Sequence, residues 1–600
     1  MPTDNKIPKP INYSNRDFTS IKNDLIDYAK RYYPDTYKDF NAASFGSLML
    51  DTVAYVGDMM SFHLDYQANE SFLTTSNEYL NILKHGRQMG YKYDYQPSSH
   101  GVLTFFILVP SDTMGTAPDT NYYPVIARGS RTKAQGNNTF TLTEDIHFSK
   151  SSNEIIVAQV DDATGNPLTY AVKASGKVVS GRYFQETIVI GDYQRFLKIP
   201  LASNLIAEVI SIIDSEGHEY FQVDHLSQNT VYINVENRST DKNLAPSILK
   251  AIAVPRRFSI ETNQNITYIQ FGYGSESELK TTPLYQPENI VLKQHAKDYI
   301  TQATFDPAVL NESDKFGVVP ANTTLTVIYR ANERSNVNAA ANTVTEPSSV
   351  NISFPSVNAI DANKQNLVRD SLECTNVEPI VGDITIPTPF ELKQRIAHNF
   401  ATQNRAVTKK DYISLVYRMP PQFGAIRKCN VLQDSDSFKR NLNLYVIAEN
   451  EGGFLTQAND TIKQNLKTWL NQYRMINDTV DILDAKVVNL GIDFVAVGRI
   501  NANKVSLFNT ILIRLKSFLN FNPEIGEPLY ITDVYKIINT TPGVIDTTDV
   551  TIVNKTGGVY SDIAYNIEQY MSPDGRLVEA PENVVFEIKY PNLDIRGTIK

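Results

Sequence analysis

The sequence predicts a multidomain α+β protein with an N-terminal helical segment, a β-rich middle and two small C-terminal α/β sandwich domains. Three observations support this. A chain of 600 residues exceeds what one hydrophobic core usually supports. Apolar residues recur at helical spacing up to about residue 92, and strand-like runs follow from Gly101. Helices and strands then alternate. We expect a helical segment over 1–95, a β-rich region over 96–386 that divides into two, a first α/β domain over 387–478, and a second over 479–600 with a C-terminal extension.

Composition excludes several classes of protein. Hydrophobic residues make up 42% and charged residues 20%, which is typical of a globular protein, and the net charge is −10. Without a basic stripe we expect no nucleic-acid binding. The two cysteines, Cys374 and Cys429, cannot form a disulfide framework, so synthesis in a reducing compartment is expected. We expect no signal peptide and no membrane insertion, because the longest apolar runs are about half of a membrane span.

Three helices are expected in the N-terminal segment. The first carries apolar residues from Phe18 to Tyr32 and ends at Pro34. The second begins at Ser44, and Tyr55 and Phe62 widen its apolar face, so more than one neighbour must cover it. We predict that its apolar stripe contacts partner subunits; the stripe comprises Phe45, Leu48, Met49, Val53, Val56, Met60 and Leu64.

A third helix is expected after a capping box from Thr75 to Glu78, in which the two side chains satisfy each other's backbone N–H groups. On the second helix, Asp51, Asp58 and Asp65 are seven residues apart and share one face. They are compatible with a solvated face or a docking stripe for a basic partner. A metal site is disfavoured because two turns, roughly 10 Å, separate successive carboxylates.

Strands dominate the middle region. The run from Val102 to Val109 is apolar on both faces, which predicts a buried strand, and further strands are expected over 187–192, 219–226, 230–235 and 266–274. The polar stretch 331–365, rich in Asn, Ser, Thr and Ala, predicts an exposed loop.

The C-terminal modules each join a short helix to a strand. Thr408 is placed to cap a helix that Pro420 and Pro421 terminate. A further helix carries Ile462 to Tyr473 on one face, and a later one covers 531–540. We take three aromatic residues on these helices as candidate interaction residues: Tyr412, Trp469 and Tyr535.

Sequence signatures of catalysis are not found. The chain has no Walker loop, no GxSxG elbow, no HExxH pair and no CxxC, and the Gly pair in FGYG at 271–274 lacks the Lys and helix of a phosphate loop. Carboxylate pairs of a hydrolase cannot be identified from sequence. We expect a protein that is not an enzyme and binds no cofactor or metal.

Three blocks resemble a known family. RAVTKKDY at 405–412, with the strand that follows near Ile426, is similar to the signature of the baseplate J-like proteins of contractile-tailed bacteriophages. The stretch 39–73 and the block IGEPLYITDVYKIINTTPGV at 525–544 resemble those of T-even-type baseplate wedge subunits. The middle region matches only loosely, chiefly in the FGYG turn.

The resemblance implies a structural virion protein. Such a subunit forms the inner, iris-like ring around the central hub and tail tube, links wedges, and rearranges when the sheath contracts. It implies pairing with a second copy through the C-terminal domains, and a helical bundle with another wedge protein at the N-terminus. The expected location is the tail baseplate of the virion, after assembly in the host cytoplasm. Rearrangement needs hinges, for which 386–390 and 474–480 are candidates.

An alternative function stays open from the sequence. The long β middle and the 33 tyrosines are also compatible with a carbohydrate- or receptor-binding tail protein. Oligosaccharide binding by the 100–386 region would distinguish this alternative from a scaffold, because fold class alone does not determine function.

Overall fold

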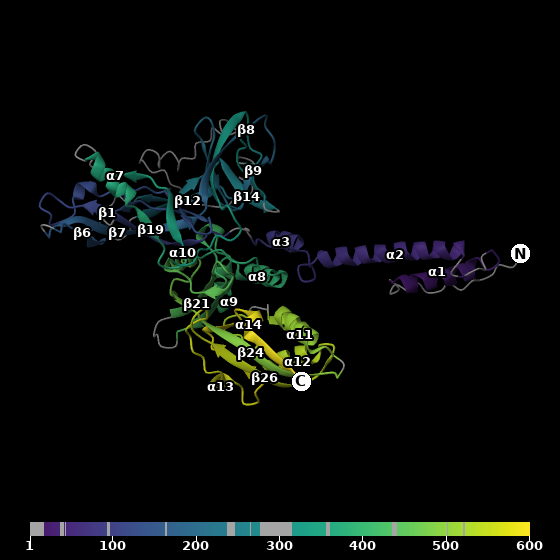
Figure 1. Ribbon diagram of the computed structural model, residues 1–600. Helices are drawn as coiled ribbons and strands as arrows, with labels where there is room; N and C mark the ends of the chain where they lie inside the picture. The colour runs from purple at the N-terminus through teal and green to yellow at the C-terminus, as the bar shows by residue number, and fades with distance from the viewer. Residues whose placement is uncertain are drawn as a thin grey trace. The chain divides into compact units, whose positions relative to one another are not determined.

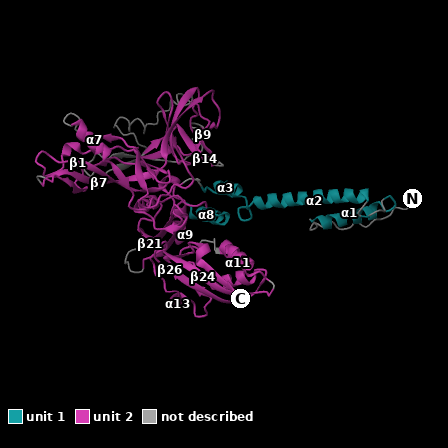
Figure 2. Cartoon of the chain, viewed as in Figure 1, with its two compact units in different colours: residues 1–93, 387–403 teal, residues 94–386, 404–600 magenta. Residues whose placement is uncertain are grey.

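The computed structural model divides the chain into two compact units (Figures 1 and 2). Unit 1 comprises residues 1–93 and 387–403, and unit 2 comprises residues 94–386 and 404–600. The structure describes residues 17–36, 41, 44–92, 97–162, 165–236, 247–263, 266–275, 315–355, 361–434, 441–500, 502–519 and 523–600. The predicted multidomain α+β fold is confirmed.

Unit 1 is helical. Its elements are α1 (Phe18–Tyr32), α2 (Phe45–Glu70), α3 (Tyr79–Gln88) and α8 (Pro389–Thr402). Asp17 caps α1, and Ser44, where the second helix was predicted to begin, caps α2. Helix α8 packs on α3, about three hundred residues earlier in the chain. The sequence predicts that 387–403 opens the first α/β domain, whereas the structure groups it with the N-terminal helices.

The first sheet of unit 2 builds the core around β1 (His100–Pro110), the predicted buried strand. Leu103, Phe105 and Ile107 on β1 are buried in this core. β1 pairs antiparallel with the long β7 (Pro167–Ser180) over its whole length. The other strands are β3 (Arg131–Ala134), β4 (Thr139–Leu142), β6 (Glu154–Val160), β17 (Val344–Ser349) and β19 (Glu373–Thr375), in the order β17-β3-β4-β7-β1-β19 with β6 also on β7.

The stretch 331–365, expected to be a loop, is partly regular. β17 pairs with β3, and β18 (Ile352–Ser353) pairs with β2 (Val125–Ile126), which also pairs with β5 (Ile146–His147). Helix α7 (Ala362–Asp370) begins within the stretch and has Asp361 as its cap. The prediction was wrong here because an edge strand needs few apolar side chains when only its backbone completes the sheet. Residues 356–360 lie outside the described part.

The second sheet has its own core. It comprises β8 (Arg182–Ile190), β9 (Lys198–Asn204), β10 (Ile206–Ile213), β11 (Glu219–Gln222), β14 (Arg257–Asn263), β15 (Ile266–Phe271) and β16 (Thr323–Ala331), in the order β8-β16-β10-β11-β14-β15-β9. A separate two-stranded sheet is formed by β12 (Thr230–Glu236) and β13 (Ser247–Ala253). Together the two large sheets form the predicted β-rich middle.

Two mixed α/β arrangements follow. The first contains α9 (Lys409–Tyr417), β20 (Lys428–Gln433), β21 (Asn441–Glu449), β22 (Leu455–Thr456), α10 (Asp460–Leu470) and β23 (Thr479–Asp484). Thr408 and Asp411 form a capping box at α9, which confirms the predicted cap. Its core is built from one face of α9, one face of α10 and the sheet.

The second contains β24 (Lys486–Gly498), α11 (Lys504–Leu519), β25 (Leu529–Tyr530), α12 (Ile531–Asn539), β26 (Val544–Lys555), α13 (Ile567–Tyr570), β27 (Leu577–Val578), β28 (Val584–Glu587), α14 (Pro591–Asp594) and β29 (Ile595–Ile599). β24 is the central strand, antiparallel to β26 and parallel to β28 and β29. Apolar side chains of α11 and α12 pack on this sheet, as expected for an α/β sandwich.

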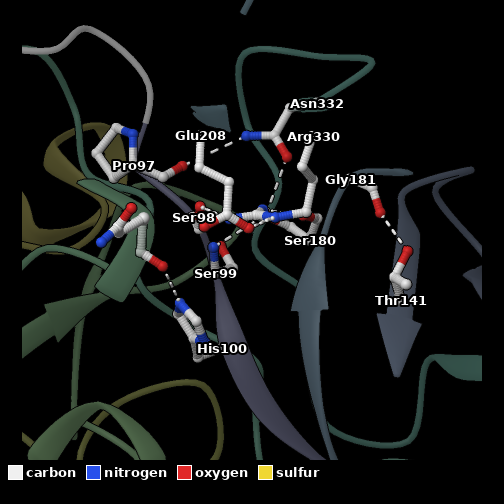
Figure 3. A network of polar contacts seen from close by, with 11 residues as sticks. Pro97, Ser98, Ser99, His100, Thr141, Ser180, Gly181, Glu208, Arg330 and Asn332 are labelled. Atoms are coloured by element: carbon white, nitrogen blue, oxygen red, sulfur yellow. Dashed lines mark hydrogen bonds and ion pairs between the residues drawn. The ribbon is translucent and has the colours of Figure 1, made fainter. Parts of the chain in front are cut away.

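A buried polar network joins the two large sheets (Figure 3). Arg330 on β16 is fully buried, and its guanidinium donates to Glu208 Oε1 at 2.8 Å and to Ser98 Oγ at 2.9 Å. Ser180 at the end of β7 donates to Asn332 Oδ1 at 3.0 Å and accepts from the Ser99 amide at 3.0 Å. A buried guanidinium is costly unless its donors are satisfied, so this network fixes the sheets against each other.

His100, at the start of β1, extends this network toward the first α/β domain (Figure 3). Its Nε2 donates to the Gln422 carbonyl at 2.8 Å. Burial lowers the pKa of His100 to about 4, the Gln422 carbonyl partly opposes this, and the positive charge of Arg330 lowers the pKa further. His100 is therefore neutral at physiological pH.

The two cysteines lie in different cores. Cys374 is buried in the core of the first sheet and Cys429 in that of the first α/β domain. Both are free thiols. No helix in the described residues is long and apolar enough to cross a membrane.

Candidate interaction surface

Helix α2 exposes most of its apolar side chains. The seven residues predicted to contact partner subunits lie on it, and each is between 48% and 72% exposed. We call these seven the α2 apolar surface: Phe45, Leu48, Met49, Val53, Val56, Met60 and Leu64. Tyr55, Met59, Phe62 and Tyr66 are also exposed, so apolar groups face solvent around much of the helix. A patch of this extent typically marks an interaction site.

Helix α1 covers only a narrow strip of α2. The buried residues of α2 are Ser47 and Ala54, both small. Gly57 also faces α1, since a Cβ at this position would lie in van der Waals contact with Ile21, 3.4 Å from its Cδ1. The contact between α1 and α2 therefore runs along small side chains, and the large apolar side chains of α2 point elsewhere.

The acidic face of α2 is partly used inside the chain. Asp51 forms an ion pair with Lys22 of α1 at 2.6 Å. Among the described residues no group of three His, Cys, Asp or Glu side chains is arranged to hold a metal. Of the three aspartates, Asp51 thus contributes to the packing of α1 on α2.

Glu70, the last residue of α2, fixes the turn into α3. Its carboxylate accepts from the Asn77 amide at 2.8 Å and from Asn81 Nδ2 at 3.0 Å, and these bonds lower the pKa of Glu70. Its carbonyl also bonds His85 Nε2 at 2.8 Å. The predicted capping box from Thr75 to Glu78 is wrong: Glu78 is the cap residue of α3 without a side-chain bond, because Glu70 supplies the acceptor instead.

Helix α3 is in turn held by α8. A Cβ on Gly86 would lie 2.9 Å from Ile396 Cδ1, so the two helices approach closely at this point. Lys393 Nζ donates to the Thr74 carbonyl at 3.1 Å. The α2 apolar surface is thereby anchored through α3 to a helix encoded far downstream, a link that no local sequence pattern indicates.

The three aromatic candidates of the C-terminal modules lie elsewhere. Tyr412 is 1% exposed and donates to Asp478 Oδ2 at 2.9 Å, and burial raises its pKa. Trp469 is buried, and its Nε1 donates to the Leu415 carbonyl at 2.8 Å. Both side chains belong to the core of the first α/β domain and are not available for the expected partner contact. Tyr535 is partly buried against the second core, so its role stays a prediction.

No sequence signal indicates that Tyr412 and Trp469 lie in a core and not at an interface. Aromatic residues on an amphipathic helix face occur both in cores and at interfaces. The acceptors Asp478 and Leu415 lie 66 and 54 residues away in the chain from Tyr412 and Trp469. The α2 apolar surface, by contrast, could be predicted from the sequence. Its large apolar residues extend over more than one face of the helix, so a single neighbouring helix cannot cover them.

Comparison with known proteins gives one family match. Residues 17–88 match the family described as "Bacteriophage baseplate protein, N-terminal domain". This segment spans α1, α2 and α3 and contains the whole α2 apolar surface. No match is found among curated proteins.

Two solved structures show weak overall likeness. One is a cryo-EM structure of the anti-feeding prophage baseplate, with TM-score 0.25 and 9% identity over 94% of this chain and 90% of that chain. The other is a type VI secretion system TssK-TssF-TssG baseplate subcomplex, with TM-score 0.26 and 8% identity over 73% of this chain and 96% of that chain. The similarity of residues 17–88 to a phage baseplate domain supports a structural baseplate protein.

Proposed function

We propose that this chain is a structural subunit of the baseplate wedge of a contractile phage tail, and that the α2 apolar surface docks into a helical bundle with another wedge protein. The observation that carries the proposal is the exposure of this surface within the segment that matches the baseplate family. Each large side chain buried by a partner helix would contribute about 1.5–3 kcal/mol. Partner helices thus supply the cover that α1 does not provide.

The wider role in the baseplate is also a proposal. The subunit forms part of the inner, iris-like ring around the hub and tail tube, links wedges, and rearranges on sheath contraction. It pairs with a second copy through its C-terminal α/β domains, and Tyr535 contributes to this contact. The protein assembles in the host cytoplasm and ends in the virion. These statements are supported by the block at 405–412, which resembles the baseplate J-like signature, and by the two blocks that resemble wedge subunits.

A carbohydrate-binding or receptor-binding role receives no comparable support. The family match lies on the helices, not on the β-rich middle from which such a role was considered. We also propose no catalytic role, because the feature that supports a function is the exposed α2 apolar surface, which is suited to assembly.

A triple substitution on α2 tests the docking role. Met49, Val53 and Met60 are exposed and touch no core, so the variant M49Q/V53Q/M60Q should fold like the wild type. We expect it to be lost from purified phage baseplates when it replaces the wild-type protein, as measured by mass spectrometry of the particles.

The matched control replaces three exposed apolar residues of unit 2, Val189, Ile476 and Ile500, by Gln. This control should enter baseplates normally. Incorporation of the α2 variant at the wild-type level would contradict docking through α2, while absence of the wild-type protein from phage particles would contradict the baseplate assignment itself.

A further inference from the structure

A buried carboxylate lies where the β-rich region meets the first α/β domain. Asp383 is buried, in the segment that follows Ile380 and leads to the boundary between the two units at 386/387. The neighbouring backbone joins several elements of unit 2: the His100 amide donates to the Val381 carbonyl at 2.8 Å, and the Ala425 amide donates to the Gly382 carbonyl at 2.8 Å. Asp383 therefore occupies the joint between the β-rich region and the first α/β domain.

The backbone at this joint is closely packed and leaves no space for a side chain at Gly382. Gly382 has a φ of +135°, and a Cβ there would lie 2.5 Å from the Ser98 carbonyl oxygen. Asn338 fixes Asp383 further, since its side-chain amide donates to the Asp383 carbonyl at 2.8 Å and accepts from the Asp383 amide at 3.0 Å. The carboxyl group itself accepts from the Val337 amide at 3.1 Å. Asp383 thus cannot turn to water while the joint is closed.

The charges around Asp383 do not compensate a carboxylate. The titratable groups on the segments around it are Glu449 and Glu451 at and after the end of β21, Arg427 ahead of β20, His100 on β1, and Arg334, which precedes Val337 and donates to the Gly136 carbonyl. Arg427 pairs with Glu449 at 3.5 Å, and His100 is neutral. Within the described part of the chain no cation forms an ion pair with Asp383. Burial raises the pKa of Asp383 to about 7, its backbone hydrogen bonds oppose this, and Glu449 raises it further.

We propose that the protonation state of Asp383 controls how tightly the joint between the β-rich region and the first α/β domain is held. With a proton, the side chain is neutral and the closed joint buries no uncompensated charge. Without it, a second negative charge is buried beside Glu449, and opening the joint to water relieves this. The proposal does not depend on the baseplate role.

The direction of the effect follows from linkage. In an open joint Asp383 has its ordinary pKa of 3.8, and in the closed joint about 7. The stabilisation from the proton is therefore fully present below about pH 4, declines as the pH rises through about 7, and is constant above that. His100 acts in the opposite direction below about pH 6.5, so its contribution must be cancelled by comparing variants at the same pH.

The test is hydrogen exchange of the full chain and of D383N between pH 5 and pH 8.5, with intrinsic exchange corrected at each pH. Asn keeps an acceptor for the Val337 amide but cannot ionise. The quantity compared is the ratio of the wild-type opening constant to that of D383N for peptides covering 335–339 and 380–386. We expect this ratio to rise about tenfold per pH unit from pH 5 to pH 7 and then to level off. A ratio that stays constant over this range overturns the proposal.

Two further variants keep the test decisive. D478N changes a buried carboxylate within the first α/β domain, one bonded to Tyr412, and should leave the pH dependence at 380–386 unchanged. If D383N does not fold, E449Q serves instead: removing the neighbouring charge should move the midpoint of opening to lower pH. An unmoved midpoint in a folded E449Q contradicts the proposal.

Discussion

At the scale of single residues, buried polar groups connect the parts of unit 2. Arg330, Ser180 and His100 each bond to a strand or domain other than their own. Satisfied buried polar groups specify one arrangement, because any other arrangement would leave them without partners. The relation between the two sheets and the first α/β domain is thus set by a few side chains.

His100 predicts a loss of stability in acid. Its pKa is about 4 in the folded chain and 6.5 when exposed, so the stability that depends on neutral His100 is present above pH 6.5 and is lost as the pH falls through about 4. The loss amounts to about 3 kcal/mol over this interval. H100Q keeps a donor for the Gln422 carbonyl and should lack this dependence in denaturant unfolding of the full chain.

The control for His100 is His147, which is exposed. H147Q should reproduce the wild-type pH profile. If H100Q and the wild type lose stability in parallel between pH 6.5 and 4, buried neutral His100 is not the cause.

Glu70 predicts a local effect. E70A removes the acceptor for the Asn77 amide and Asn81, so amides at 77–81 should exchange faster with deuterium while those of unit 2 are unaffected. In the wild type this protection should be present near neutral pH and decline as the pH falls below the ordinary Glu range, since the pKa of Glu70 is lowered. Q67A, at an exposed position one turn earlier, should show wild-type exchange.

At the scale of elements, helix caps and helix packing determine where each segment begins and what it contacts. T408A removes the side-chain bond to the Asp411 amide and should reduce stability by about 1 kcal/mol in denaturant unfolding. T468A removes only an exposed hydroxyl that bonds within α10, and should change stability by less than about 0.5 kcal/mol. Equal effects of the two substitutions would contradict the capping interpretation.

The contact between α3 and α8 gives a second prediction at this scale. G86V introduces methyl groups against Ile396 and should loosen α8, seen as faster proteolysis within 387–403. Adding I396A makes room and should restore part of the resistance. A double variant that is as sensitive as G86V would show that the close approach of the two helices is not what holds α8.

The elements also show how far a sequence predicts this structure. Ser44, Thr408 and the buried strand β1 were predictable because caps and apolar runs are local signals. Glu70 as a distant acceptor and α8 as a partner of α3 were not, since these are tertiary contacts. Tyr412 and Trp469 were assigned to an interface because periodicity reports an apolar face but not what covers it. On α2, by contrast, the apolar residues are too many for one covered helix face, and the sequence therefore correctly predicted that they are exposed.

At the scale of the whole molecule, the two units differ in how much they bury. α1 has no buried residue and α2 only two small ones, whereas the cores of unit 2 contain many large apolar side chains. Exchange in the isolated full chain should therefore be fast in α1 and α2 and slow in β24 and β26. When the protein is part of an assembled baseplate, we expect α2 to become protected. Slow exchange of α2 in the isolated chain would indicate that it needs no partner.

The exposed α2 also affects how the protein must be supplied. A copy whose α2 is uncovered exposes apolar side chains that can associate with those of other such copies, which promotes aggregation. If a partner covers α2 as proposed, production of this subunit should be balanced against that of its partner, and an excess of this subunit should yield insoluble material instead of additional particles.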